Sequence, residues 1–125
     1  MASYELVGLR IDARGHVPEV LKMRSDYPNP VQWRWYKLDG SYTEGNEPDN
    51  SLFDIRVDAR GHVREVLIGY EGTYRWVKLD GTSTPCAYPG GPPRLLNLRL
   101  DARGHVREVQ MANEVWYDLN GEIAA

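Results

Sequence analysis

Cysteine is almost absent from this chain of 125 residues, and the single Cys86 excludes an intrachain disulfide. A secreted scaffold held together by disulfides is therefore not expected. No stretch approaches the roughly 20 apolar residues that a membrane-spanning helix needs. The first residues also lack an apolar run of signal-peptide length. We therefore expect a soluble, cytoplasmic protein with no membrane partner.

A large excess of charge of either sign is also missing. The formal net charge is −3, and the hydrophobic and charged fractions of 42% and 26% are ordinary for a globular protein. This balance gives no broad attraction to nucleic acid, so no nucleic-acid partner is expected. A chain of this length forms one domain, and we expect residues 1–125 to share a single core.

Sequence motifs of common enzymes are lacking as well. The chain has no glycine-rich phosphate loop before a helix, no metalloprotease helix motif and no nucleophile elbow. The aspartates of its recurring motifs are explained by turns. We therefore expect a protein that is not an enzyme and needs no cofactor.

What the chain does contain is a threefold internal repeat. The segment RIDARGHVPEV at Arg10–Val20 returns as RVDARGHVREV at Arg56–Val66 and as RLDARGHVREV at Arg99–Val109. The copies start 46 and then 43 residues apart, which predicts three repeats at about 4–48, 49–91 and 92–125. The apolar position after the first arginine varies, whereas most of the polar positions are identical.

Each copy has the residues of a β-hairpin. A short alternating strand is followed by Asp-Ala-Arg-Gly, in which the aspartate accepts backbone N–H groups and the glycine supplies the positive φ of a type I turn with a bulge. The return arm breaks strict alternation and predicts a β-bulge, and Pro18 predicts irregular pairing in the first copy. A second motif ends in Asp-Gly or Asn-Gly at Gly40, Gly81 and Gly121, which predicts two-residue type I′ turns.

Four short strands in about 43 residues, three times over, predict an all-β fold. A lone four-stranded unit cannot bury its apolar face, whereas three units that close around a pseudo-threefold axis share one core. A β-trefoil is the expected architecture, and a three-bladed propeller-like ring is the alternative. The pattern Asp-x-x-Gly-x-Val-x-x-Val resembles the hairpin of RHS/YD repeats, although Ile, Val or Leu replaces the tyrosine before the aspartate and the period differs. We draw no function from this resemblance.

Three sets of equivalent residues are candidates for ligand binding. We call them the strand tryptophans, the tip arginines and the turn histidines. They are Trp35, Trp76 and Trp116; Arg14, Arg60 and Arg103; and His16, His62 and His105. Strand parity places the tryptophans beside polar residues and opposite an apolar stripe that includes Leu38 and Leu79. An exposed ring beside hydrogen-bonding groups can stack on a sugar, so the expected function is a lectin-like binding protein with up to three equivalent sites for carbohydrate or another small polar ligand. The alternative for the tryptophans is that they cover the base of the barrel and lie in the core.

Two other functions remain open. Exposed aromatic residues are also anchors of protein interfaces, so a protein-binding inhibitor or an immunity-type protein is the first alternative. The turn histidines are the only histidines of the chain, and three imidazoles meeting at an axis would hold a metal ion with an open coordination position. A metal-dependent enzyme at His16, His62 and His105 is therefore the more distant alternative, and it requires the turn tips to converge.

The first arginine and the glutamate of each motif form a further recurring pair. These are Arg10 with Glu19, Arg56 with Glu65, and Arg99 with Glu108. We interpret them as cross-strand ion pairs on the sheet surface, each contributing about 0–1 kcal/mol to stability. The alternative interpretation is that these residues and the tip arginines together form a recurring anion or carboxylate site, because an arginine beside a turn with free backbone N–H groups suits phosphate, sulfate or acidic side chains.

Overall fold

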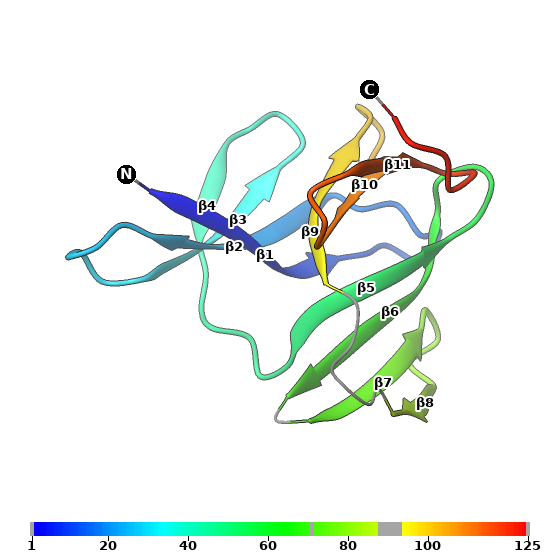
Figure 1. Cartoon of the computed structure of the whole chain (residues 1–125), viewed down its shortest axis with the longest axis horizontal. Coiled ribbons are helices and arrows are strands. Elements are labelled where there is room, and N and C mark those ends of the chain that lie inside the picture. Colours follow the sequence, from blue (N-terminus) through cyan, green and yellow to red (C-terminus); the bar gives the residue numbers. More distant parts are fainter. Residues whose placement is uncertain (1, 71, 88–93, 125) are drawn as a thin grey trace.

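The computed structural model describes residues 2–70, 72–87 and 94–124, which form eleven strands in three antiparallel sheets (Figure 1). The first sheet contains β1 (Ser3–Arg10), β2 (Glu19–Ser25), β3 (Gln32–Lys37) and β4 (Tyr42–Glu44). The second contains β5 (Ser51–Val57), β6 (Val63–Tyr70), β7 (Thr73–Lys78) and β8 (Ser83–Cys86). The third contains β9 (Leu95–Leu100), β10 (Val106–Met111) and β11 (Trp116–Asp118).

Each sheet is a meander in which consecutive strands pair, and each contains one copy of the repeated motif. We call each sheet with its turns a unit. The all-β prediction is therefore confirmed. In the third sheet the expected fourth strand is reduced to a single bridge between Tyr117 and Ile123. The expected boundary between the second and third repeats, at residues 91 and 92, lies outside the described residues.

Helix is absent from the part of the chain that the structure describes. Correspondingly, these residues include no helix that is long and apolar enough to cross a membrane.

The first hairpin turn of each unit has the predicted geometry. Gly15, Gly61 and Gly104 have φ values of 93°, 88° and 86°. In the first unit the Asp12 N–H donates to the His16 carbonyl and the Gly15 N–H donates to the Asp12 carbonyl, both at 3.0 Å, and the same pair of bonds recurs in the other two units. This is a three-residue loop that ends in a glycine bulge.

The predicted bulge in the return arm is present in the second and third units. Arg64 lies between residues that pair with Val57 and Arg56, and Arg107 occupies the same position in the third unit. The corresponding residue of the first unit is Pro18, and there β2 begins only at Glu19. Proline cannot donate a ladder hydrogen bond, which explains the shorter pairing.

The second hairpin turn differs from the prediction. A type I′ turn requires positive φ at both central residues. Gly40 has a φ of 90°, but the φ of Asp39 is not positive. The Lys37 N–H donates to the Ser41 carbonyl, and the Gly40 N–H donates to the Lys37 carbonyl. The loop is therefore a three-residue turn with a glycine bulge like the first one, and the two-residue assignment is wrong.

The buried core takes the same positions from each unit. Leu6, Leu52 and Leu95 come from the first strands, Val17, Val63 and Val106 follow the turn histidines, and Ile55 joins them. The three valines are fully buried, and β1, β5 and β9 contact one another beside this cluster. No ladder joins one sheet to another among the described residues. The β-trefoil stays a prediction.

Candidate functional site

Three backbone hydrogen bonds bring the first turns of the units together. The Val63 N–H donates to the Gly15 carbonyl, Val106 to Gly61, and Val17 to Gly104, each at 2.8 Å. The bonds thus run from the first unit to the second, from the second to the third, and from the third back to the first. Because each histidine lies between a bonded glycine and a bonded valine, this pattern carries all three imidazoles to one place.

The turn histidines form a compact cluster. Their ring centroids are 4.9 Å apart for His16 and His62, 4.6 Å for His16 and His105, and 4.8 Å for His62 and His105. One ring nitrogen from each lies within 4.8 Å of the others, and the Nε2 atoms of His16 and His105 are 3.0 Å apart. The side chains retain 23%, 16% and 15% of their exposure, so the cluster is open to solvent on one side.

Each imidazole is oriented by an aspartate of its own turn. We call Asp12, Asp58 and Asp101 the turn aspartates. One carboxylate oxygen accepts backbone N–H groups of the turn, and the other faces the histidine Nδ1 at 3.1, 3.3 and 3.1 Å in the first, second and third units. A carboxylate that holds the far nitrogen of an imidazole is the usual outer partner of a metal-bound histidine.

Two of these aspartates are also clamped by an arginine. Arg64 donates from Nε and Nη2 to Asp58 Oδ2 at 3.0 and 2.7 Å, and Arg107 makes the same contacts with Asp101 at 3.1 and 2.7 Å. These bulge arginines have no counterpart in the first unit, where Pro18 occupies the position. The outer shell of the cluster is therefore asymmetric.

The turn aspartates are held in their ionised form. Partial burial alone raises the pKa of the Asp58 carboxyl, but hydrogen bonds from Arg64 and from backbone N–H groups outweigh burial and hold that pKa well below its usual range. The balance is the same for Asp101, with Arg107 as the donor. At Asp12, burial again raises the pKa of the carboxyl, but hydrogen bonds from the backbone N–H groups of His16 and Arg14 and from the His16 ring outweigh it and lower that pKa.

An ionised carboxylate only accepts hydrogen bonds, so the Nδ1 atom that it contacts carries the proton. In the neutral imidazole the Nε2 atom then presents a lone pair. One ring nitrogen of His62 lies within 4.8 Å of one ring nitrogen of each of the other two histidines, and the Nε2 atoms of His16 and His105 lie 3.0 Å apart. Lone pairs at this separation repel each other unless a proton or a cation lies between them.

The remaining motif residues lie on the sheets. The expected cross-strand ion pairs are confirmed, with Arg10 to Glu19 at 2.7 Å, Arg56 to Glu65 at 3.3 Å and Arg99 to Glu108 at 2.6 Å. The same arginines, which we call the strand arginines, lie over the rings of Trp35, Trp76 and Trp116 at 4.1, 3.9 and 4.0 Å from the centroids. Each unit thus stacks an arginine on its tryptophan and pairs it with a glutamate.

Trp76 is buried, whereas strand parity predicts an exposed ring. Trp76 is only 6% exposed, whereas Leu38 and Leu79 of the expected apolar stripe are 40% and 38% exposed. The register explains this, because Trp76 pairs with the fully buried Leu67, and residues opposite each other in an antiparallel pair share a face. An exposed sugar platform at Trp76 is therefore not what the structure shows.

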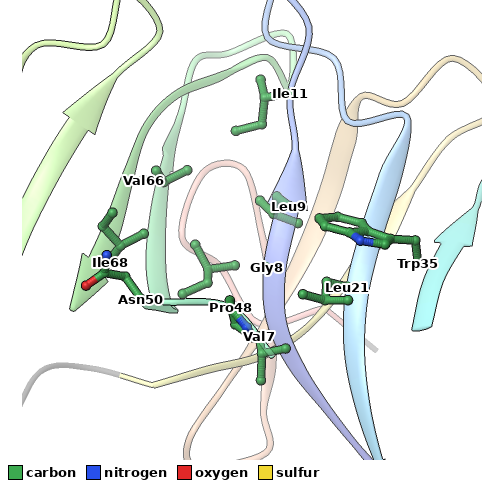
Figure 2. A pocket seen from close by; sticks show the side chains of 11 residues that line it. Val7, Gly8, Leu9, Ile11, Leu21, Trp35, Pro48, Asn50, Val66 and Ile68 are labelled. Atoms are coloured by element: carbon green, nitrogen blue, oxygen red, sulfur yellow. The ribbon is translucent and has the colours of Figure 1, made fainter. Parts of the chain in front are cut away.

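Trp35 lines an apolar pocket of about 200 Å³ between the first two sheets (Figure 2). In this view Val66 and Ile68 of β6 lie opposite Leu21 and Trp35. No charged side chain of the described residues lines the pocket, and Asn50 contributes an amide group to the lining. Its lining shows that both sheets contribute side chains to the space between them.

Sequence reasoning therefore found the turn histidines but missed their partners. The sequence alone explains the turn aspartates by the turns and does not single out the bulge arginines. A signal was present, because each histidine follows an aspartate by four residues in all three copies. The carboxylate has two oxygens and performs both tasks, with one oxygen on the backbone and one on the imidazole.

No family model, no curated protein and no solved structure matches this chain.

Proposed function

We propose that this protein binds one divalent transition-metal ion, Zn²⁺ by preference, through Nε2 of His16, His62 and His105. The observation that carries the proposal is the meeting of three imidazole nitrogens, from rings whose Nδ1 atoms each contact an ionised aspartate. Imidazole suits zinc, and three histidines with an open fourth position are a known zinc geometry.

The distances support this proposal. Nitrogens bound to one zinc ion at about 2.0–2.1 Å lie roughly 3.3 Å apart when the geometry is tetrahedral. The turn histidines have one such pair at 3.0 Å and the whole set within 4.8 Å, so small side-chain rotations suffice. A cation also removes the repulsion between the converging lone pairs. We propose binding here and no reaction, although an open position on zinc is where water is activated in hydrolytic sites.

We further propose that the three units form a pseudo-threefold ring, closer to a three-bladed propeller than to a β-trefoil. The ring of hydrogen bonds between turn glycines and valines supports this arrangement, as does the contact of the first strand of each sheet with those of the other two. In such a ring the three turn tips make one site, so the expected stoichiometry is one ion per chain.

Carbohydrate binding at the strand tryptophans and binding of a protein partner stay predictions. The burial of Trp76 and the arginine over each ring weigh against sugar stacking, because a sugar must first displace the arginine. The metal site is therefore the better supported function.

Isothermal titration with Zn²⁺ tests the proposal. The unchanged protein should bind one ion per chain, and His62→Ala should remove that binding while circular dichroism confirms the β fold. Arg75→Gln, an exposed position on β7, is the control and should bind as the unchanged protein does. Absence of saturable binding, or equal binding by His62→Ala, would overturn the proposal.

A further inference from the structure

The tip arginines are the unpaired cations of the repeated motif. The strand arginines bond to glutamates and the bulge arginines bond to turn aspartates. Arg14, Arg60 and Arg103 are exposed, and among the residues that the structure describes none has a side-chain hydrogen bond or ion pair. Their side chains are therefore available to a ligand, and they recur unchanged in all three copies of the motif.

Two of these arginines face the same hollow as the histidines. An open hollow of about 640 Å³ is lined by the turn histidines together with Arg14, Arg64 and Arg103. All three units thus contribute a guanidinium to its wall. Arg64 uses Nε and Nη2 to hold Asp58, which leaves its Nη1 group unused by that carboxylate.

The charge around the hollow has the opposite sign from that of the chain as a whole. Three arginines and, among the described residues, no carboxylate line the hollow, whereas the chain has a formal net charge of −3. A bound divalent cation with neutral imidazole ligands adds two further positive charges. The hollow therefore attracts anions more strongly than the remaining surface does.

We infer that the hollow binds a small oxyanion of the phosphate type, which becomes the fourth ligand of the metal ion and is held by Arg14 and Arg103. This inference rests on the proposed metal site. One oxygen of the anion takes the open coordination position, and the other oxygens accept N–H groups of the guanidinium groups, whose planar fork matches phosphate and carboxylate geometry. Phosphate displaces a water molecule from the metal, and no covalent bond of the anion changes.

The occupant is small because of where the cations lie. The guanidinium groups and the imidazoles surround one hollow, so the anion must reach the metal and the arginines at once. A long polyanion such as nucleic acid would need a row of cations over the sheets. There the strand arginines are already paired with glutamates.

The experiment uses full-length protein loaded with Co²⁺, because the visible absorption of this ion reports changes in its ligands. Co²⁺ is first titrated into the protein without phosphate, and inorganic phosphate is then added at constant ionic strength. We expect a saturable spectral change at one phosphate per chain. The double variant Arg14→Gln, Arg103→Gln should bind Co²⁺ normally and phosphate about tenfold or more weakly, since hydrogen bonds to charged groups are the strong ones.

Arg75→Gln is the matched control, because it removes an exposed positive charge from β7. It should leave the phosphate affinity unchanged. The inference is overturned, with the metal site intact, if Co²⁺ binds but phosphate leaves the spectrum unchanged. It is also overturned if the double variant binds phosphate as tightly as the control. Failure of Co²⁺ to bind in the first titration overturns the proposed function and the anion site together.

Discussion

The carbonyl oxygen of Gly61 accepts a hydrogen bond from the backbone N–H of Val106 at 2.8 Å, and this contact joins the second unit to the third. The approach is close because glycine has no side chain. A Cβ atom built on Gly61 would lie 2.3 Å from the Val106 carbonyl oxygen. The same relationship joins Gly15 to Val63 and Gly104 to Val17, so one small residue in each unit permits the histidines to converge.

Replacing Gly61 by alanine should therefore be costly. The new Cβ meets backbone that cannot move without breaking the link to Val106, and the φ of 88° is strained for alanine. We expect a loss of about 2 kcal/mol or more in the free energy of unfolding, measured by urea denaturation.

Gly81→Ala is the control for this comparison. Gly81 has nearly the same φ, 89°, but nothing lies within 4 Å of its Cβ position. Only the backbone strain then remains, and the loss should be about 1 kcal/mol. Equal losses for Gly61→Ala and Gly81→Ala would show that the contact between units contributes little.

Trp76→Ala tests the burial of the second strand tryptophan. The side chain is 6% exposed and supports Arg56, so truncation leaves a cavity and should cost about 3–5 kcal/mol in thermal or urea unfolding. Tyr70→Ala, at a side chain that is 62% exposed, should change stability by less than about 0.5 kcal/mol. A stable Trp76→Ala protein that has lost binding in a glycan array would instead support the lectin-like prediction.

Asp54→Asn should stabilise the protein at neutral pH. Burial raises the pKa of the Asp54 carboxyl more than the Ile55 N–H and the charge of Arg56 lower it. Because this pKa lies above its unfolded value, the ionised side chain costs stability at pH 7, and the cost disappears as pH falls below both values. The third unit provides the template, since Asn97 makes the same bond to the following N–H.

Thermal melts at pH 7 and pH 3 measure this effect. We expect the melting temperature of Asp54→Asn to exceed that of the unchanged protein at pH 7, and the difference to vanish at pH 3. A lower melting temperature for Asp54→Asn at pH 7 would contradict this account of Asp54.

Asp101→Asn tests the outer shell of the metal site. The amide oxygen can still accept hydrogen bonds from the backbone N–H groups of the turn. The NH₂ group that replaces the second carboxylate oxygen is itself a donor, so it cannot accept the hydrogen bond from the Nδ1–H group of His105. Zn²⁺ affinity should fall about 10–100-fold, as measured by competition with a chelator. Asp80→Asn changes an aspartate of a second hairpin turn and should leave the affinity unchanged.

Local features of the fold could be predicted from the sequence, and contacts between units could not. The turn at Asp12–Gly15 and the bulges follow from residues adjacent in the chain, and both predictions are confirmed. The turn at Gly40 was assigned one residue too short, because Asp-Gly suits both loop lengths. Which side of β7 carries Trp76 depended on its register with Leu67, and strand parity alone does not give that register.

In the candidate site, too, the sequence predicts local features but not the contacts between units. The sequence singled out His16, His62 and His105, but their convergence depends on hydrogen bonds between residues more than 40 positions apart. The second role of Asp12 also required the structure. Its turn function was visible in the sequence, whereas the contact of its second carboxylate oxygen with the imidazole depends on where that ring points.

A crystal of the protein grown with Zn²⁺ and measured on both sides of the zinc absorption edge tests the central claim most directly. We predict one strong anomalous peak per chain, at about 2.0–2.1 Å from Nε2 of His16, His62 and His105. A map without a peak among the three imidazoles, or with the zinc bound elsewhere on the chain, would contradict the claim.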